Sequence, residues 1–291
     1  MRISENQVKI EGILSEVGLE TATFNRKGQT TECIRGTIKI RVEQAINGTM
    51  TTMEVPVSAF ASRYTNAGAE NPAYNSLKDV MENYKSIAAC GNIDDADRVR
   101  ITNGSLQENV FYAKNGDLVN TSRISASFIN KIAKNECKPE ATFTATIVVG
   151  NKSDELDRDG TPTNRLNVNG VIMQYGERAD LIKFIVAKPE AKNHIEQYWN
   201  DGDTVRVQGK VNFSSKTEYI EEEVGFGEPI KTAKTTSVHE LLIESGSAGC
   251  LEGDAAYDIK DIQSALAARK VRIEETKKPV ANAPSKPDFG F

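Results

Sequence analysis

Apolar and polar residues alternate along much of this chain, and a period of two predicts β-strands that bury one face. Residues 33–44 show the pattern most strictly. Their inner positions are Ile34, Ile38, Ile40 and Val42. Their outer positions are Arg35, Thr37, Lys39 and Arg41. Strands are predicted in the same way for residues 6–17, 51–60, 97–102, 141–150, 165–176, 179–187, 203–213 and 238–245, and the segment 107–132 supplies the last strand of the first half.

Helical periodicity separates these strands at two corresponding points. An apolar stripe predicts a helix over residues 75–87, capped by Asn75 or Ser76. A shorter helix is predicted over residues 192–199. An amphipathic helix over 257–273 follows the last strand, with acidic residues near its start and basic residues near its end.

Turn and loop residues supply the remaining boundaries. The Asn-Gly pairs at 47–48 and 115–116 predict tight hairpin turns. Residues 18–31 and 151–164 are polar and are predicted to be loops. The hairpin segment 214–236 contains an acidic run, Glu221–Glu222–Glu223, which is most simply a solvated surface.

The order strand, strand, strand, helix, strand, strand occurs twice. DADRVRITNGSL at 95–106 matches DGDTVRVQGKVNF at 201–213, with Arg100 aligned to Arg206. This repetition predicts that one small β unit is used twice. The expected units are residues 1–138 and 139–246, followed by a linker and helix over 247–273 and a flexible tail over 274–291.

Both units resemble OB-folds over residues 6–245. The resemblance implies a mainly β protein of two tandem OB-fold barrels, each five-stranded and Greek-key, with a short helix between strands three and four. The C-terminal helix and disordered tail lie outside the barrels. An OB core followed by a linker and an end of Asp288-Phe289-Gly290-Phe291 resembles single-stranded DNA-binding proteins of the bacterial type.

Two features depart from that bacterial pattern. The chain has two units instead of one, and its tail carries Lys277, Lys278 and Lys286. It therefore looks more like a single-stranded DNA-binding protein of a bacteriophage or mobile element. The resemblance implies that Asp288, Phe289 and Phe291 dock on a replication or recombination protein.

Charge and cysteine content change this picture little. The net charge is −5, and residues 214–291 carry 14 acidic against 10 basic groups, so the body is near neutral. No apolar run approaches the roughly 20 residues that span a membrane, and the N-terminal residues have no signal-peptide core. The scattered Cys33, Cys90, Cys137 and Cys250 predict a reducing cytoplasm, that of the host if the protein is viral, and no zinc site.

Catalysis is not expected. His194 and His239 have no partner motif, and no phosphate-binding loop is present. Asp154, Asp157 and Asp159 lack the Gly and Glu offsets of a calcium loop. We therefore expect no metal, no cofactor and no enzymatic activity.

Binding of single-stranded nucleic acid needs a basic groove and aromatic platforms. The candidate cations are Arg35, Lys39, Arg41, Arg98, Arg100, Arg165, Lys183, Arg206 and Lys210. The candidate platforms are Phe24, Tyr64, Phe111, Tyr112, Phe128, Tyr175, Trp199, Tyr219 and Phe226. The competing interpretations are a solvated strand face for the cations and a core position for Trp199. Tyr84, Phe143, Phe184 and Phe213 are expected in the core.

The expected function is sequence-tolerant binding of single-stranded DNA in replication or recombination, because stacking accepts every base. Two alternatives stay open: a non-catalytic OB-fold adaptor that binds proteins, and a single-stranded RNA binder. The sequence does not decide the oligomeric state.

Overall fold

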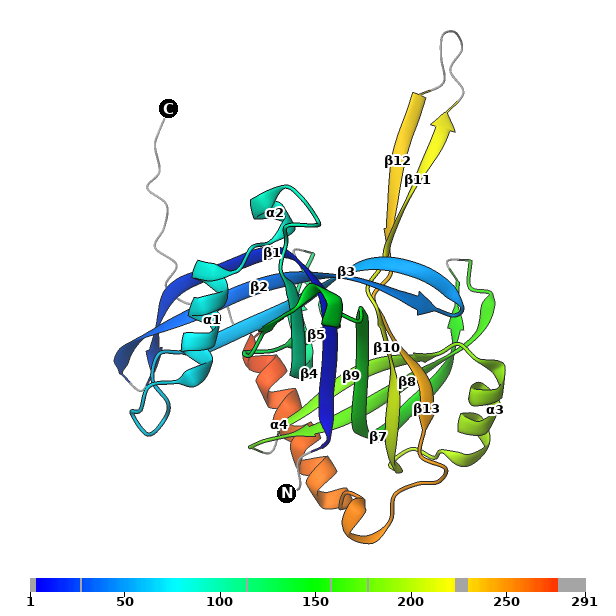
Figure 1. The fold of residues 1–291 in the computed structure, drawn as a ribbon. Helices are drawn as coiled ribbons and strands as arrows, with labels where there is room; N and C mark the ends of the chain where they lie inside the picture. Colours follow the sequence, from blue (N-terminus) through cyan, green and yellow to red (C-terminus); the bar gives the residue numbers. More distant parts are fainter. Residues whose placement is uncertain are drawn as a thin grey trace, which may run out of the picture.

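The computed structural model (Figure 1) describes residues 4–276 apart from residues 27, 114, 158, 177 and 223–229. For residues 26, 29, 216–222 and 230–234 it describes the backbone alone. The first half contains β1 (Asn6–Arg26), β2 (Gln29–Ile46), β3 (Thr49–Ser62), α1 (Pro72–Asn83), α2 (Ile87–Cys90), β4 (Arg98–Tyr112), β5 (Leu118–Ser125) and β6 (Asn130–Ile132).

The second half contains β7 (Glu140–Leu156), β8 (Pro162–Gln174), β9 (Arg178–Val186), α3 (Pro189–Tyr198), β10 (Thr204–Asn212), β11 (Ser215–Glu222), β12 (Ile230–Ser237) and β13 (Glu240–Gly246). Helix α4 (Ile259–Thr276) follows. Three-residue 3-10 helices cover Lys134–Glu136 and Gly253–Ala255. The repeated element order and the C-terminal helix are therefore confirmed.

In each half the strand pairing returns to its starting strand. Strands β1, β2 and β3 pair antiparallel, β3 pairs parallel with β5, β5 pairs with β4, and β4 returns to β1. Strands β7, β8, β9, β13 and β10 repeat this order, including the parallel step from β9 to β13. The start of β1 also pairs with β7, and this joins both halves into one eleven-stranded sheet.

The alternating residues form the core as predicted. Ile34, Ile38, Ile40 and Val42 are buried on β2. Val205, Val207 and Val211 are buried on β10, and Phe143, Phe184, Phe213 and Trp199 are buried with them. These side chains belong to one apolar cluster that runs through both halves. Each contributes roughly 1.5–3 kcal/mol by leaving water, so this cluster is the main force that holds the sheet closed.

The two predicted loops are wrong, because the strands continue through them. Residues 18–26 extend β1, and β2 begins at Gln29, so the predicted loop is reduced to a short turn. Gly28 supplies a φ of 82° for that turn. In the second half β7 runs to Leu156 and β8 begins at Pro162. Thr-rich polar segments suit exposed strands as well as loops, and cross-strand hydrogen bonds decide between them.

The turns and the first helix confirm some details and correct others. Asn47 and Gly48 both have positive φ, 49° and 83°, as a two-residue hairpin requires. Helix α1 begins three residues before the predicted start. Its cap is Asn71, whose side chain accepts from the N–H of Ala73, and the predicted caps Asn75 and Ser76 lie inside the helix.

Helix α4 lies across both halves of the sheet. Ile262 and Ala265 pack on Val171, Met173 and Ala179 of the second half. Arg269 binds Glu108 on β4 of the first half, while Arg272 reaches Asp180 on β9. Burial raises the pKa of the Asp180 carboxyl, and the nearby cations Arg178 and Arg272 oppose this effect. The helix thus connects the halves through a buried polar cluster.

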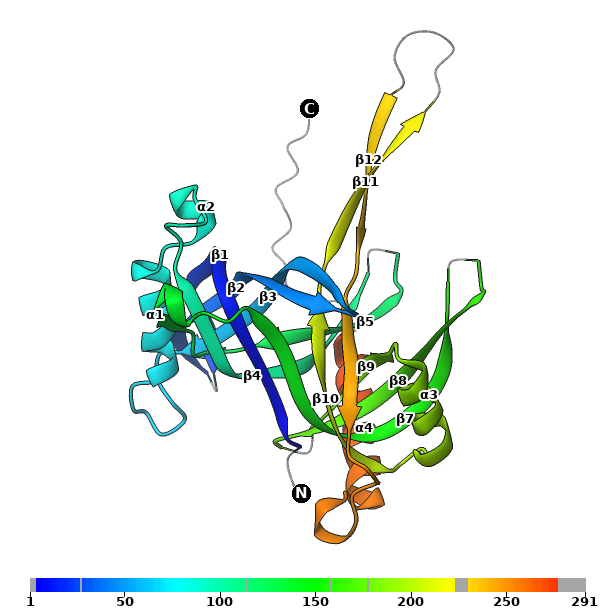
Figure 2. The same ribbon diagram turned by 45° about the vertical axis from the view of Figure 1, so that its right-hand side comes forward.

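The β11–β12 hairpin projects away from the rest of the described chain, as two views agree (Figure 1 and Figure 2). Its strands pair only with each other. Among the described residues no helix is both long and apolar enough to cross a membrane.

Candidate nucleic-acid interface

Two cavities with a mixed polar and apolar lining lie on the outer faces of the two halves and meet at one short segment. The β9 cavity, of about 510 Å³, lies between β5 of the first half and β8, β9 and the start of β13 in the second. The β3 cavity, of about 440 Å³, lies between β2–β3 and the residues next to Phe213. Ser237, Val238 and His239 line both cavities. Residues of both halves line each cavity.

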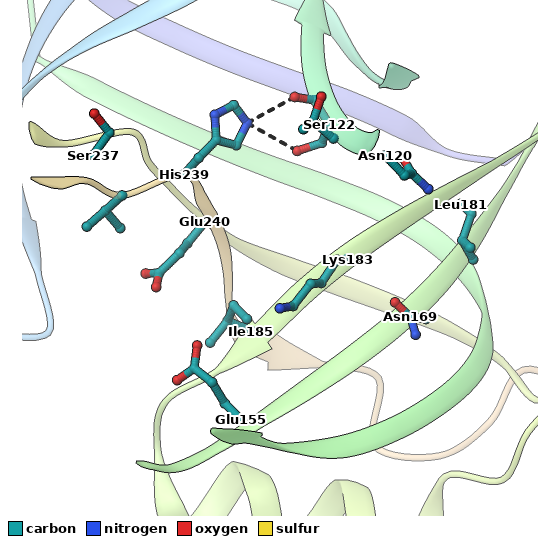
Figure 3. Close-up of a pocket in the computed structure, with 12 residues that line it drawn as sticks. Asn120, Ser122, Glu155, Asn169, Leu181, Lys183, Ile185, Ser237, His239 and Glu240 are labelled. Carbon is teal, nitrogen blue, oxygen red and sulfur yellow. Dashed lines mark hydrogen bonds between the residues drawn. The ribbon is translucent and has the colours of Figure 1, made fainter. Parts of the chain in front are cut away.

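Strand alternation positions the polar residues of the β9 cavity. Ile182 and Phe184 on β9 are buried, so Lys183 between them faces outward. Asn169 on β8 lies opposite Lys183 in the strand register. Figure 3 shows Lys183 on its strand between Leu181 and Ile185, with Asn120 and Ser122 on the facing strand β5. Lys183 has no ion-pair partner among the described residues.

The β3 cavity follows from the same rule. Ile40 and Val42 are buried, which leaves Arg41 on the outer face of β2 opposite Glu54 of β3. The Glu54 carboxylate accepts a hydrogen bond from the Ser15 hydroxyl at 2.5 Å. Arg41, like Lys183, forms no ion pair within the described part of the chain. Among the described residues, each cavity therefore holds one cation that has no carboxylate partner.

His239 stands at the junction of the two cavities. Its ring stacks on Phe213, with centroids 3.6 Å apart and an interplanar angle of 27°. Its Nε2 lies 2.9 Å from the Ser122 carbonyl oxygen and 3.3 Å from the Ser122 hydroxyl (Figure 3). Packing among these neighbours lowers the pKa of His239 below its ordinary value, and the bond to Ser122 partly opposes this.

Arg165 contacts both acidic residues of the β9 cavity, Glu155 and Glu240, and its single positive charge offsets one of the two carboxylates. Its Nη2 donates to Glu240 at 2.7 Å, and its Nε lies 3.3 Å from the Glu155 carboxylate. The second contact lacks hydrogen-bond geometry, since the Nε atom is buried without a hydrogen-bond acceptor. Arg165 was predicted to bind nucleic acid, but its charge is already used. The net charge of the cavity then depends on Lys183.

An aromatic pair lies farther along the outer face of β2–β3. Phe24 meets Phe60 edge to face, with centroids 5.5 Å apart. Arg35 lies opposite Phe60 in the register and forms an exposed ion pair with Glu20. Phe60 is 51% exposed and was missed by the sequence analysis, although it shares the outer parity of Glu54, Pro56 and Ser58. Pro56 lies within β3, which continues past it to Ser62.

Lys39 belongs to the same outer face but is paired. Its Nζ lies 2.6 Å from Glu16, and this bond raises the pKa of Lys39. Lys210 on β10 contacts Glu244 at 3.4 Å and donates to the Ala45 carbonyl. Exposed pairs of this kind contribute about 0–1 kcal/mol, so Lys39 and Arg35 can exchange a carboxylate for another anion.

The three arginines of the repeated strands, which were predicted to bind nucleic acid, line neither cavity, and each already has hydrogen-bond partners. Arg98 is 8% exposed, and its guanidinium donates to the backbone carbonyls of Ile93 and Ala96. Arg100 holds Glu11 of β1 with two hydrogen bonds of 2.7 and 3.2 Å. Arg206 holds Glu5 with bonds of 2.6 and 2.9 Å. These bonds lower the pKa of Glu5 and of Glu11.

The remaining predicted platforms whose side chains the structure describes line neither cavity. Tyr64, Phe111, Phe128 and Tyr175 are exposed, and Tyr112 is half-buried. Trp199 is buried, as its core interpretation expected. Phe226, Asp288, Phe289 and Phe291 lie outside the described residues, as does the side chain of Tyr219.

Within the part of the chain that the structure describes, no three His, Cys, Asp or Glu side chains gather as metal ligands would. In the described part of the chain the two cavities offer amides, hydroxyls, flat rings and two cations without an ion-pair partner, beside the carboxylates of Glu54, Glu155 and Glu240. Such a set suits hydrogen bonding, charge pairing and stacking with a ligand that carries both anionic and aromatic groups.

Comparisons with known proteins agree on the fold. A family model described as YorF matches residues 4–279. A search of curated proteins finds no match. The crystal structure of the single-stranded DNA-binding protein from Thermus aquaticus is similar, with a TM-score of 0.52 and 10% identity over 88% of this chain and 98% of that one. The crystal structure of a deletion mutant of that protein has a TM-score of 0.50 and 12% identity, over 87% of this chain and 98% of that one. The chain thus has the fold of those structures.

Proposed function

We propose that this chain, which belongs to the YorF family, binds single-stranded DNA without catalysing a reaction. One observation carries the proposal: the β3 and β9 cavities occupy the outer faces of strands two and three in the two halves and meet at Ser237–His239. We also infer that each closed ring of five strands is an OB-type barrel. In such barrels this face and its loops bind oligonucleotides.

The proposed mechanism pairs phosphates with cations and stacks bases on rings. Arg41 and Lys183 would each meet a phosphate, because neither has a carboxylate partner in the described chain. Asn169 would supply hydrogen bonds from the neighbouring strand. Phe24 and Phe60 would stack bases at the far end of the β2–β3 face. Stacking accepts any base, so binding would tolerate most sequences.

The charge distribution predicts a shallow salt dependence. Each phosphate contact on a single strand contributes about 0.7 to the slope of log K against log salt. The two free cations therefore predict a slope of about −1.4, and about −2.8 if Arg35 and Lys39 also leave their carboxylates. A net charge of −5 is compatible with this, because the excess lies mainly beyond residue 213.

Finer assignments belong to the same proposal. We place the activity in DNA replication or recombination, in the cytoplasm and in a bacteriophage or mobile element. The support is the resemblance of the two-unit chain and its terminal Asp288-Phe289-Gly290-Phe291 to single-stranded DNA-binding proteins. The similarity of fold to the Thermus aquaticus protein, which is named for single-stranded DNA binding, adds to that support.

The test is fluorescence anisotropy of labelled oligo-dT across a salt series, with duplex DNA and RNA as competitors. The double variant R41A/K183A should lose affinity and flatten the slope. Its matched control is K260A/K270A, which removes the same charge from exposed positions on α4. Absence of binding by the wild-type protein at low salt would refute the proposal. Preferential capture by RNA would redirect it to RNA, and equal losses in both double variants would refute the assigned groove.

A further inference from the structure

His239 is held at the one place where both cavities meet. The segment Ser237–His239 lines each of them and leads from β12 into β13. Val238 fixes the segment, because its N–H donates to the Ser214 carbonyl at 2.7 Å. A ligand that extends from the β3 cavity into the β9 cavity must therefore pass His239.

Two contacts fix the orientation of the His239 ring. One ring face lies on Phe213, which is only 8% exposed and is itself anchored in the core. The Nε2 atom lies 2.9 Å from the Ser122 carbonyl oxygen. A carbonyl can only accept, so Nε2 carries the hydrogen and donates it across the gap between the halves. The ring is thus pre-positioned, which reduces the entropy lost on binding.

The surface that stays open has the shape and chemistry of a base-stacking site. His239 is exposed, although one face lies on Phe213 and one edge lies on Ser122. The second ring face and the Nδ1 edge take part in neither of these contacts, and His239 lines both cavities. Histidine is one of the aromatic side chains on which unpaired bases stack. Arg41 in one cavity and Lys183 in the other provide cations on either side of the ring.

We infer that His239 is a base-stacking platform over which one strand of DNA crosses from the β3 cavity to the β9 cavity. The inference rests on the proposed function and adds to it a single continuous path through both halves. The competing role is structural: the bond to Ser122 ties β5 to β13, and no base touches the ring.

Nuclear magnetic resonance can test the contact directly, because the chain has only two histidines. Oligo-dT of about 20 nucleotides exceeds the ~4–16 nucleotides that one OB unit covers. On its addition the ring C–H signals of His239 should shift upfield, since a stacked base shields them. The signals of His194, which lines neither cavity, should stay in place. Unchanged His239 signals at saturation would overturn the inference.

Two substitutions test the contributions of the ring and of its hydrogen bond separately. H239F keeps an aromatic face and loses the bond to Ser122; H239Q keeps a donor and loses the ring. We expect H239Q to weaken binding about 5- to 150-fold, which is 1–3 kcal/mol at 1.4 kcal/mol per tenfold. H239F should stay within about threefold of wild type, since stacking is sequence-tolerant and needs only a flat ring. H194Q is the matched control and should bind normally.

The outcomes distinguish failure of this inference from failure of the proposed function. If wild-type protein does not bind oligo-dT, both fail. If it binds and R41A/K183A is weakened while H239Q is normal, the platform alone is refuted. If H239F is as weak as H239Q, the tie to Ser122 matters and the platform is again refuted. The NMR measurement uses wild-type protein, so it does not depend on the folding of any variant.

Discussion

Helix α4 offers the sharpest test of how the two halves are held together. The Glu108 side chain on β4 is 1% exposed and Arg269 is 14% exposed. The Arg269 Nε donates to both Glu108 oxygens, at 3.0 and 2.8 Å, and Nη2 makes a further contact. Arg269→Ala would leave a buried carboxylate whose nearest remaining cation is Arg272, at 3.6 Å.

The expected loss of unfolding free energy follows from the burial of Glu108. Removal of one partner from a buried ion pair costs about 3–5 kcal/mol, and the residual Arg272 contact favours the lower figure of about 3 kcal/mol. Domains approaching this size lose about 2–4 °C of melting temperature per kcal/mol, so the midpoint should fall by about 6–12 °C. The matched control is Lys270→Ala, which removes an exposed charge from the next position and should change stability by at most about 0.5 kcal/mol.

Thermal and denaturant unfolding measure this prediction, and a double variant tests its cause. If the cost is the uncompensated charge of Glu108, then E108Q/R269A should be more stable than R269A alone, because glutamine removes that charge and keeps the shape. If R269A melts like K270A, the buried pair contributes nothing. If the double variant is less stable than R269A, the cost comes from lost packing and the electrostatic reasoning is refuted.

Three further predictions concern the sheet and the cavities. A Cβ added at Gly209 would lie 1.8 Å from the Leu242 carbonyl oxygen and 2.7 Å from the Phe143 ring. G209A should therefore push β10 away from β13 and lower the unfolding free energy by about 3 kcal/mol. The control G249A, where a Cβ would meet open space, should leave the unfolding free energy unchanged. K183A should make the salt slope of oligo-dT binding shallower by about 0.7, and an unchanged slope would remove Lys183 from the phosphate contacts. The pKa of His239 is lowered from 6.5, so its stabilising contribution is present above that pH and is lost as the pH falls through the folded-state pKa. The unfolding free energy of wild type should therefore fall more steeply than that of H239F on acidification below 6.5, and parallel curves would contradict the shift.

Local patterns predicted the fold well wherever one strand face is buried. The parity of Ile34, Ile38 and Ile40 identified the core of β2, and Asn47-Gly48 identified a turn with two positive φ values. The pattern did not predict where the long β1–β2 hairpin ends. The side chains of residues 18–25 are exposed or half-buried and impose little alternation, so their strand depends on pairing with β2, which a single segment does not reveal.

Strand alternation also predicted part of the candidate site. Arg41 and Lys183 were found because their neighbours along the strand are buried. His239 was not, because a single histidine before a strand carries no periodic signal. Its position depends on Phe213 below it and on Ser122 of the other half, and neither contact follows from spacing along the chain.

The repeated strand shows why a basic face in sequence need not be a binding face. Arg100 and Arg206 align in the two copies, and both meet a glutamate near the start of β1, Glu11 and Glu5. Strand β1 closes the first ring against β4 and also runs beside β7, the first strand of the second ring. Arg206 on β10 pairs with Glu5, which precedes β1, so this ion pair spans the two halves, whereas the Arg100–Glu11 pair lies within the first half. Both arginines are already paired, and our proposal therefore assigns the phosphate contacts to cations on strands two and three.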